Sequence, residues 1–344
     1  MKKFFLLVLA LLLLVPGRSI ACSDFRVKAQ DGTVVIGRSM EFPVDLKSEL
    51  CVVPRGAGKY GFLAVNAFGI KDAYVDGFNE KGLSLDGLMF TGAVYQPEVA
   101  GRSLPVDKFG AWLLGNYASI DEVKAALAAV NITAAKNKKL RDLGMHLAVH
   151  DAAGHSLVVE FIGGQKNVYD NPLGVMTNRP SFDWQLANLR NYVNLDAEDK
   201  GPRQLNGLKI EPTGVGSGLH GLPGDWTPPS RFVKLSFGVD AALKPQNAAG
   251  AVNLAEHLLN TVDIPKGAIK EPTALPGKYL YGYAQWVVIK DLTNKVLYYK
   301  TYENTVWRSV DLKRFDLAAG QAVKTLALAA QGAPALDVTG ELKP

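Results

Sequence analysis

The 344-residue sequence contains only two cysteines, Cys22 and Cys51. Two cysteines can form at most one bridge, so the chain is not a disulfide-stapled scaffold. A Cys22–Cys51 bridge and a buried free Cys51 remain alternatives, and the apolar segment Leu50-Cys51-Val52-Val53 favours the free thiol. Hydrophobic residues make up 48% of the chain, which is enough to bury a core without covalent staples.

The sequence also lacks a strong charge of either sign. It has 38 Lys and Arg against 33 Asp and Glu, a net charge of +5. The first 21 residues carry three basic residues and no acidic one, which leaves a net charge of +2 for residues 22–344. No dense cluster of Lys and Arg occurs, and this absence argues against a nucleic-acid partner.

Long apolar runs are absent everywhere except at the N-terminus, where Phe4–Val15 follows two lysines. Ser19-Ile20-Ala21 then supplies small residues at the two positions that a signal peptidase reads. A dozen apolar residues are too few to span a bilayer, which needs about 20. We therefore predict that residues 1–21 are a cleaved signal peptide and that no segment spans the membrane. Residues 22–344 are expected to form one periplasmic or secreted domain.

Alternation of polar and apolar residues predicts strands, several of them in hairpins. They are expected at 24–29, 33–38, 83–90, 146–150, 156–161, 285–289, 296–302 and 305–310. A capping box, Ser119-Ile120-Asp121-Glu122, predicts an Ala-rich helix to about Val130. Further helices are expected at 106–117, 182–192 and 248–262. Hairpins mixed with helices indicate an α+β fold with antiparallel sheet.

Two segments are expected to lie outside this regular structure. Residues 196–226 are polar and rich in Gly and Pro, which predicts a long loop or an arm. The Ala-rich end, 318–344, is expected to form a helix followed by a loose tail from about 331.

Cleavage after Ala21 would leave Cys22 with its α-amino group and its thiol on the same residue. The α-amine titrates near 7.7–8.0 and a thiol near 8.5 in model compounds, so proton transfer between them is nearly balanced. The amine can then act as general base for its own nucleophile, as in N-terminal threonine enzymes. Cys22 is therefore the candidate nucleophile.

The neighbouring hairpin suggests partners for Cys22. If Asp31-Gly32 is a two-residue turn, Cys22 lies opposite Glu41, whose carboxylate would hold the α-ammonium. The same register puts Arg38 opposite Phe25, on the other face from Cys22, so that Arg38 reaches the sulfur only through a bulge.

A second interpretation of Cys22 is open at this point. Bacterial lipoproteins also carry a cysteine at the cleavage position, where it is acylated and anchors the protein to the membrane. Such a cysteine cannot be a nucleophile, and the protein would be a binding protein. Lipoprotein signals normally have Leu three residues before the cysteine, where this chain has Ser19. The N-terminus alone leaves both interpretations open.

Six sequence blocks resemble the choloylglycine hydrolase / penicillin V acylase family, in the family's order. They are Cys22, 37–42 (GRSMEF), 53–56 (VPRG), 76–83 (DGFNEKGL), 175–180 (VMTNRP) and 216–232, from Gly216-Ser217-Gly218 to Pro229-Ser230-Arg231-Phe232. The resemblance implies an N-terminal nucleophile hydrolase of linear amides with a four-layer αββα sandwich of two antiparallel sheets. It also implies a small-molecule N-acyl amide substrate, no metal or cofactor, and a homotetramer. The substrate would be of the penicillin V, conjugated bile salt or N-acyl homoserine lactone type.

The resemblance further assigns roles to individual residues. Cys22 would be nucleophile and base, and Arg38 would favour its thiolate. Asn178 would donate its side-chain amide, and Met89 its backbone N–H, to the oxyanion. Arg231 would stabilise charge near the nucleophile. Without the resemblance, Arg38 could be a surface ion-pair residue, Asn178 a turn residue and Arg231 a helix-start residue.

Two positions depart from the family pattern. Glu41 stands where the family usually has Asp to bind the amine, and it is one methylene longer. Met89 stands where bile salt hydrolases have Asn and penicillin acylases often have Tyr. Its backbone donor is unaffected, and its flexible apolar side chain suits an acyl chain.

Three other patterns are weaker. Residues 216–221 match the dinucleotide pattern GxGxxG but lack the strand–turn–helix context, so they are interpreted as a loop. His146 and His150 lie in a strand-like run without the glutamate of HExxH, and are expected to be hydrogen-bonded rather than to bind a metal. His220 as a base for Cys22 is a further alternative.

Overall fold

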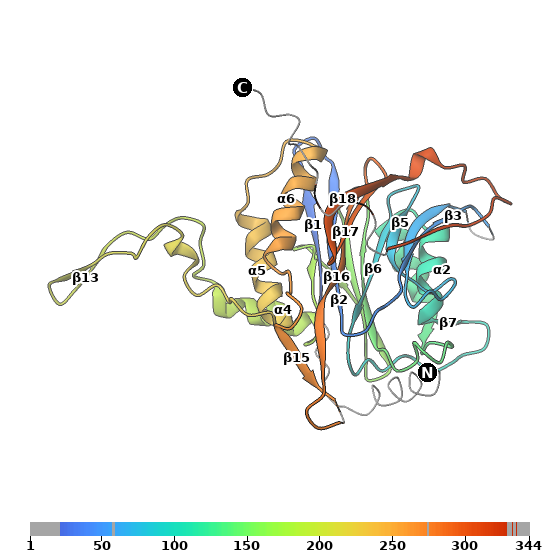
Figure 1. Cartoon of the computed structure of the whole chain (residues 1–344), viewed down its shortest axis with the longest axis horizontal. Helices are drawn as coiled ribbons and strands as arrows, with labels where there is room; N and C mark the ends of the chain where they lie inside the picture. The colour runs from blue at the N-terminus through green and yellow to red at the C-terminus, as the bar shows by residue number, and fades with distance from the viewer. Residues whose placement is uncertain (1–20, 57–58, 274, 329–331, 333–334, 336–344) are drawn as a thin grey trace.

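The computed structural model describes residues 21–56, 59–273 and 275–328, together with residues 332 and 335. The predicted signal peptide, apart from Ala21, lies outside the described residues, and so does nearly all of the predicted loose tail from about 331. Two antiparallel sheets face each other, and helices lie on the outer side of each (Figure 1). None of the helices in the described part of the chain is long and apolar enough to cross a membrane.

The first sheet begins at the predicted nucleophile. Its strand order is β12-β1-β2-β16-β17-β18, with β15 paired to β16, and the pairings are antiparallel. The strands are β1 (Cys22–Lys28), β2 (Val34–Phe42), β12 (Val175–Met176), β15 (Ile269–Pro272), β16 (Tyr279–Asp291), β17 (Val296–Thr301) and β18 (Asn304–Asp311). Every residue of β2 is buried, because both faces of this central strand are covered.

The second sheet has the order β11-β10-β9-β6-β5-β4-β3-β19 and is also antiparallel. Its strands are β3 (Glu49–Val53), β4 (Phe62–Asn66), β5 (Tyr74–Asn79), β6 (Ser84–Met89), β9 (Met145–His150), β10 (Ser156–Ile162), β11 (Gln165–Asp170) and β19 (Lys324–Ala327). A short parallel pair, β7 (Ser103–Pro105) and β8 (Asn131–Thr133), lies apart from both sheets.

Helices α2 (Phe109–Asn116) and α3 (Ile120–Ala129) cover the second sheet. The predicted capping box forms in a modified form. Ser119 Oγ accepts from the Glu122 N–H at 3.3 Å, and Glu122 Oε2 accepts at 2.7 Å from the N–H of Ala118, one residue before the N-cap Ser119. Val123 and Leu127 of α3 are buried in one apolar cluster with the residues of α2. Burying each such side chain contributes about 1.5–3 kcal/mol.

Helices α4 (Phe182–Asn188), α5 (Pro228–Ala241) and α6 (Ala248–Asn260) cover the first sheet (Figure 1). Phe232 of α5 and Ala255 of α6 are buried in one cluster with Phe25 and Ile36 of the sheet. Short 3-10 turns occupy η1 (Val106–Lys108), η2 (Leu189–Tyr192), η3 (Ser217–Leu219) and η4 (Leu312–Arg314). The predicted α+β fold with two antiparallel sheets in αββα layers is confirmed.

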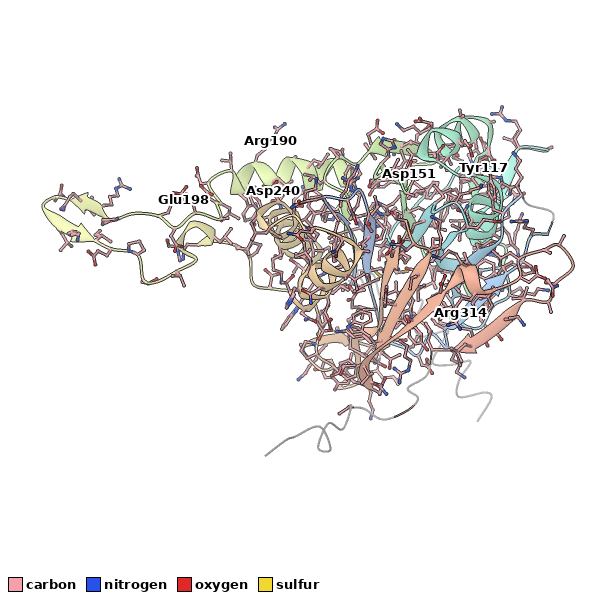
Figure 2. The ribbon with its side chains drawn as sticks, turned by 90° about the horizontal axis from the view of Figure 1, so that it is seen from above. Tyr117, Asp151, Arg190, Glu198, Asp240 and Arg314 are labelled. Atoms are coloured by element: carbon pink, nitrogen blue, oxygen red, sulfur yellow. The ribbon has the colours of Figure 1, made fainter. Side chains whose placement is uncertain are left out.

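The predicted arm projects from the body of the protein. It carries the hairpin of β13 (Arg203–Leu205) and β14 (Leu208–Ile210), and Glu198 lies along it (Figures 1 and 2). Residues 216–221 lie in this arm and are not preceded by a strand that could support a dinucleotide site. Their interpretation as a loop is therefore correct.

The sequence prediction missed several elements, among them the strands β3, β4, β5, β11 and β15 and the helix α5, and its C-terminal helix is wrong. The sequence did not predict α5, because its start at Pro228-Pro229 resembles a loop; proline at the first helical position needs no N–H partner there. The helix expected after Ala318 is wrong for residues 318–328. Those residues contain β19, which pairs with the edge of β3 and satisfies the backbone groups of both strands.

The turn of the β1–β2 hairpin is longer than predicted. The Ala29 N–H donates to the Thr33 carbonyl at 2.8 Å, which leaves residues 30–32 as a three-residue loop. Gly32 has a φ of +90°, the left-handed conformation that closes such loops. The predicted two-residue Asp31-Gly32 turn is therefore wrong.

This longer turn shifts the strand register by one residue. The observed pairs include Cys22–Met40, Ser23–Ser39 and Asp24–Arg38. The predicted pairs Cys22–Glu41 and Phe25–Arg38 are wrong. Because paired side chains share a face of the sheet, Arg38 lies on the same face as Cys22 and needs no bulge to approach it. Glu41 points to the opposite face, towards the helices.

Candidate active site

Cys22 is the first residue of β1, and its side chain is fully buried. Its backbone N–H donates to Asn178 Oδ1 at 2.6 Å, and its Sγ lies 3.9 Å from Met40 Sδ. Cys22 is joined here to Ala21, whose carbonyl accepts from the Glu41 N–H at 3.1 Å. The contacts of the Cys22 nitrogen are therefore those of an amide, with residue 21 attached.

Asn178 follows β12 and links three parts of the site. Its Oδ1 accepts from Cys22 and also from Arg231 Nη2 at 2.9 Å, while its Nδ2 donates to the Met89 carbonyl at 2.7 Å. These three contacts fix the orientation of the amide. One N–H of Nδ2 remains beyond the bond to Met89, since a side-chain amide has two.

Arg231 reaches Cys22 from α5. Its Nη1 donates to the Cys22 carbonyl at 2.5 Å and to Ser23 Oγ at 2.6 Å, and its Nε donates to the Trp226 carbonyl at 2.9 Å. The side chain is fully buried, and burial lowers the pKa of Arg231 although Glu41 opposes that shift. Four hydrogen bonds from this guanidinium, including the one to Asn178, hold the start of β1 against the helix layer.

Arg38 approaches Cys22 from the space between the sheets. Its Nη1 donates to the Ser39 carbonyl and its Nη2 to the Gly87 carbonyl, both at 2.6 Å. Burial alone would lower the pKa of Arg38, but Cys22 and two nearby carboxylates hold that pKa above its usual range. A permanent positive charge beside the sulfur favours a thiolate.

Glu41 is fully buried, and neither of its carboxylate oxygens has a hydrogen-bond partner among the described residues. Burial raises the pKa of Glu41 to about 7, and Arg231 only partly offsets this. An unpaired buried carboxylate is costly when it is ionised. While Cys22 remains linked to Ala21, Glu41 has no cationic nitrogen of Cys22 to bind.

The raised pKa of Glu41 predicts a pH-dependent stability. The folded chain that retains Ala21 keeps this proton at pH values where the unfolded chain has lost it. The stabilisation of the folded chain by protonated Glu41 is thus fully present below about pH 4.5 and is lost as the pH rises through about 7. We expect the free energy of unfolding to fall by roughly 3 kcal/mol from this group, and Glu41→Gln to remove the fall. Urea unfolding of the wild-type protein and of Glu41→Gln, near pH 5 and near pH 8, measures this loss. An equal pH dependence of stability in the two proteins would contradict the raised pKa of Glu41.

A small apolar cavity of about 40 Å³ opens beside Cys22. It is lined by Cys22, Met40, Phe42, Leu46, Ala67, Phe68, Val75, Gly87, Met89, Leu140, Leu143 and Met145. The sulfur of the candidate nucleophile thus meets a surface that is almost wholly apolar. Met89 contributes to this surface, as expected from its side chain.

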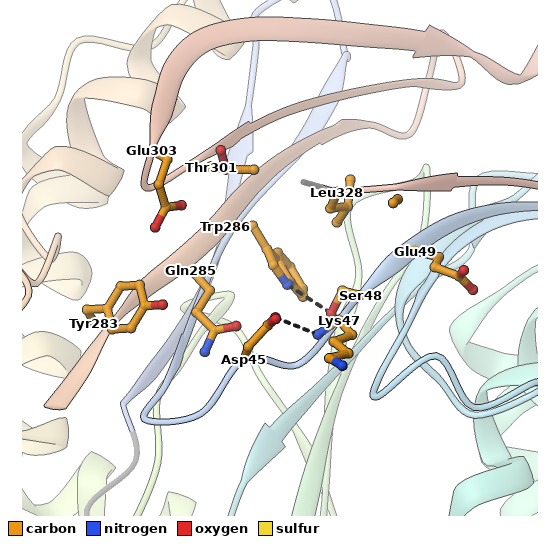
Figure 3. Close-up of a pocket in the computed structure, with 11 residues that line it drawn as sticks. Asp45, Lys47, Ser48, Glu49, Tyr283, Gln285, Trp286, Thr301, Glu303 and Leu328 are labelled. Atoms are coloured by element: carbon orange, nitrogen blue, oxygen red, sulfur yellow. Dashed lines mark hydrogen bonds between the residues drawn. The ribbon is translucent and has the colours of Figure 1, made fainter. Parts of the chain in front are cut away.

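A larger groove of about 550 Å³ lies on the other side of residues 42–48 (Figure 3). Its walls carry Asp45, Glu49, Glu303 and Tyr283. Gln285 lines the groove, and its Nε2 donates to the Phe42 and Val44 carbonyls at 2.9 and 2.6 Å. Cys22 does not line this groove, so the larger volume of the groove does not make it the candidate reaction site.

His146 and His150 are hydrogen-bonded, as predicted. His146 Nδ1 lies 2.9 Å from Glu160 Oε1, and His150 Nε2 lies 2.8 Å from Asp24 Oδ1. His220 is exposed on the arm, and no contact between it and Cys22 occurs in the described part of the chain. The alternative of His220 as base therefore has no support.

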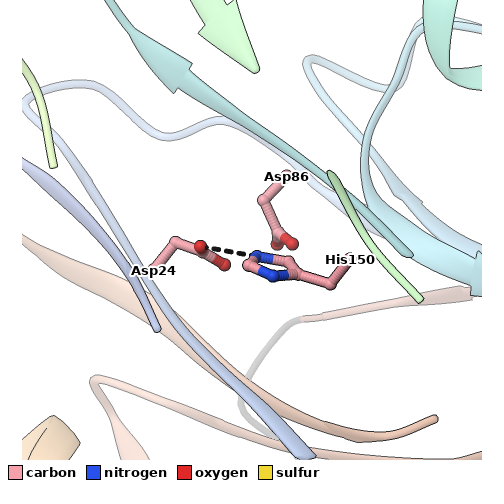
Figure 4. Close-up of side chains that lie close together, drawn as sticks. All are labelled: Asp24, Asp86 and His150. Carbon is pink, nitrogen blue, oxygen red and sulfur yellow. Dashed lines mark hydrogen bonds and ion pairs between the residues drawn. The ribbon is translucent and has the colours of Figure 1, made fainter. Parts of the chain in front are cut away.

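Asp24, Asp86 and His150 bring three potential ligand atoms within 4.8 Å of one another (Figure 4). These donors already have protein partners: Asp24 contacts His150, and Asp86 Oδ1 lies 2.5 Å from Lys290 Nζ. A cation placed there would also face the positive charges of Lys290 and Arg38. We therefore interpret the cluster as a buried ion-pair network rather than a metal site.

The sequence as a whole matches known amide hydrolases. Residues 22–326 match the family model of linear amide C–N hydrolases, choloylglycine hydrolase family. The bile salt hydrolase/transferase of Clostridium perfringens is 33% identical over 326 residues, which cover 88% of this chain and 96% of that protein. This chain belongs to the choloylglycine hydrolase family. It is a hydrolase of linear amide carbon–nitrogen bonds.

Solved structures of family members agree with this assignment. A variant of the conjugated bile acid hydrolase from Clostridium perfringens is 31% identical and has a TM-score of 0.82, covering 92% of this chain and all of that one. Penicillin V acylase from Agrobacterium tumefaciens, at 24% identity and a TM-score of 0.73, covers 90% of this chain and 92% of that one and shares the fold. The resemblance noted in the sequence is thus confirmed.

Proposed function

We propose that this protein is an exported hydrolase that cleaves an N-acyl amide through a thioester on Cys22. The observation that carries the proposal is the convergence of Asn178, Arg231 and Arg38 on this one cysteine. The family match also begins at Cys22, at the residue that cleavage after Ala21 would expose.

The proposed reaction uses the α-amine and the thiol of Cys22 together with Asn178 and the backbone of Met89. After cleavage, the free α-amine takes the thiol proton and the thiolate attacks the acyl carbon. The oxygen of the tetrahedral intermediate accepts from the remaining Nδ2 N–H of Asn178 and from the Met89 N–H. The leaving amine then departs with the proton held by the α-ammonium. Water hydrolyses the thioester, which releases the acid and restores the thiol.

Removal of Ala21 would also change the surroundings of Glu41. The Cys22 nitrogen would gain a positive charge when protonated, while its neighbour Asn178 can accept only one of the new N–H bonds well. The carboxylate of Glu41, unpartnered in the uncleaved chain, would then bind the ammonium. Glu41 would hold the amine in place, as the family position implies, despite the register shift.

The apolar cavity favours a linear acyl chain as the part of the substrate that is recognised. Bile salts and penicillin V, which the names of the relatives mention, carry rigid or aromatic acyl groups. The cavity beside Cys22 is small and lined by flexible side chains such as Met40 and Met89. Among N-acyl amides, the N-acyl homoserine lactones combine a linear chain with a polar amine.

Chain length is the variable that tests this substrate class. Each methylene buried in the cavity contributes about 0.8 kcal/mol, so kcat/KM should rise by up to roughly fourfold per added methylene until the cavity is full. Replacing Met89 by Tyr should shift the preference towards penicillin V and retain the backbone donor. The measurement is kcat/KM for an acyl homoserine lactone series and penicillin V on both proteins. A flat response, with a bile salt conjugate as best substrate, would contradict the acyl-chain proposal but not the amidase activity.

Export and the state of Cys22 are tested by the mass of the native protein. We expect the periplasmic or secreted protein to have the mass of residues 22–344 with an unmodified Cys22. A mass increased by a diacylglycerol on Cys22 would instead show a lipid-anchored protein, whose blocked cysteine could not react as proposed.

A further inference from the structure

A layer of buried charge lies between the two sheets, behind Cys22. Lys290 from β16 and Arg38 from β2 face Asp76 from β5 and Asp86 from β6, and all four side chains are fully buried. Lys290 Nζ lies 2.5 Å from Asp86 Oδ1 and 3.4 Å from Asp76 Oδ2. Arg38 Nε lies 3.5 and 3.6 Å from the same two atoms. The two cations therefore share one pair of carboxyl groups.

The layer continues to a third buried acid, Asp24, which lies beside Asp86 and His150. Asp24 Oδ1 lies 2.8 Å from His150 Nε2, and His150 Nδ1 lies 2.7 Å from Ser156 Oγ (Figure 4). Asp24 Oδ2 has no hydrogen-bond partner among the described residues. The layer thus holds three carboxyl groups against two permanent cations.

Fold stability does not account for this arrangement. Placing an ion pair in a protein interior costs several kcal/mol per ion in desolvation, and well-packed apolar residues are often as stable or more so. The space between two sheets is normally filled by apolar side chains. The charged layer is therefore a candidate for a functional role, and Arg38 is its member closest to the candidate nucleophile.

Arg38 connects the charged layer to the nucleophile. The guanidinium has five N–H donors; two bind the Ser39 and Gly87 carbonyls, and Nε faces the carboxyl pair. Arg38 also interacts electrostatically with Cys22, which lies on the same face of the first sheet, in the residue pair next to Asp24–Arg38 on that face. A charge gained or lost at Asp86 or Lys290 is therefore felt at the sulfur, because interactions in a dry interior are weakly screened.

We propose that Lys290 and Asp86 are positioning residues that balance the charge of Arg38 and so set how readily Cys22 becomes a thiolate. The inference rests on the proposed role of Cys22 as nucleophile. The ionisable groups around this centre are Arg38 and Glu41 on β2, Asp24 on β1, Asp76 on β5, Asp86 on β6, His150 on β9, Lys290 on β16 and Arg231 on α5. Of these, Lys290 and Asp86 form the closest pair and can be changed without touching the reacting atoms.

The test measures how the rate of alkylation of Cys22 by iodoacetamide depends on pH in the protein that begins at Cys22. The alkylated Cys22 peptide is quantified by mass, and the midpoint is the pH at which the rate reaches half its maximum. Asp86→Asn removes a negative charge that opposes the thiolate, so the midpoint should fall by about one pH unit. Lys290→Met removes a positive charge that favours it, so the midpoint should rise by about one pH unit. The double variant should return close to the wild-type midpoint, and kcat/KM should show the same shifts in its acidic limb.

Two further variants separate charge from packing. Lys300→Met is the same substitution on the neighbouring strand β17, where Lys300 pairs with Glu256 of α6, and it should leave the midpoint unchanged. Asp76→Asn should move the midpoint less than Asp86→Asn. Asp76 lies farther from Lys290 than Asp86 does, at 3.4 Å against 2.5 Å. Burial raises the pKa of Asp76, whereas Lys290 and Arg38 hold the pKa of Asp86 low against its burial.

Midpoint shifts of opposite sign in Asp86→Asn and Lys290→Met support the proposal. A loss of packing would not depend on the sign of the charge that was removed. Equal midpoints in all variants, or shifts of one sign, would overturn the proposal. If Lys290→Met does not fold, the midpoint of Asp86→Asn decides alone: a fall supports the proposal and no change overturns it. The alkylation needs no substrate, so a protein that shows these shifts without amide turnover would refute the proposed function and leave this inference standing.

Discussion

Replacing Cys22 by alanine should reduce the hydrolysis of any N-acyl amide substrate by at least about 10⁴-fold, the scale on which a covalent nucleophile contributes. The protein should still fold, because Cys22 contributes one sulfur atom to a core cluster that many other side chains form. The α-amine of residue 22 would remain, but without the thiol it has no nucleophile to activate. The measurement is kcat on the best acyl amide, together with the far-UV spectrum and the melting temperature of the variant.

Cys51→Ala is the matched control for this prediction. Cys51 is buried in β3, and burial raises the pKa of its thiol to about 12, so it stays protonated. Its Sγ contacts the Glu49 carbonyl and the Asn66 side chain, away from the apolar cavity. We expect this variant to lose about 1 kcal/mol of stability and to retain its turnover. Normal activity in Cys22→Ala, or an equal loss in both variants, would exclude Cys22 as the nucleophile.

The fold was largely predictable where local patterns agree with burial. The eight predicted strands occur, because their alternating residues match sheets with a buried face. Helix α3 was found from its capping box. The pattern failed for α5, whose two prolines hide a helix start, and for β19, which is defined by its partner β3 rather than by its own composition.

The hairpin shows how a small local error spreads. The residues Asp31-Gly32 match a two-residue turn, but the chain uses Gln30 as well, and Gly32 closes a three-residue loop. One extra residue in a turn exchanges the two faces of the following strand. The predicted neighbourhood of Cys22 was right, while the faces assigned to Arg38 and Glu41 were exchanged.

The site divides into residues that have a local signal and residues that do not. Cys22 follows from the cleavage pattern, whereas Asn178 and Arg231 came only from the family resemblance. The structure brings both into hydrogen-bond contact with Cys22 from more than 150 residues away. A local sequence pattern does not predict contacts between residues so far apart in the chain.

The buried charges between the sheets were missed for the same reason. Lys290 interrupts the apolar run Val287–Leu292, and Asp86 interrupts Leu83–Leu88, which was the available signal. A charged residue in a strand that is buried on both faces must have a partner. The sequence could have indicated that Lys290 and Asp86 each need a partner. Only the packing of the two sheets shows that they are partners of each other.

A single residue before Cys22 should remove most of the activity. We compare a chain that begins with Cys22 after removal of its initiator methionine with one that begins with Ala21 in the same way. Retaining Ala21 keeps the Cys22 nitrogen in an amide, which cannot accept the thiol proton. Loss of a general base costs about 10²–10⁴-fold, so kcat of the Ala21 protein should fall by at least about 10²-fold. Intact mass must first establish the N-terminus of each preparation.

The structure explains why one residue should have this effect. With Ala21 present, its carbonyl is bound by the Glu41 N–H and the Cys22 N–H is bound by Asn178, so the uncleaved end is held within the site itself. Under the proposal, cleavage would free the Cys22 nitrogen and give the Glu41 carboxylate a cationic partner. Equal turnover by the two chains would exclude the α-amine as base. Glu41, whose pKa burial raises to about 7, would then be the first residue to test in that role.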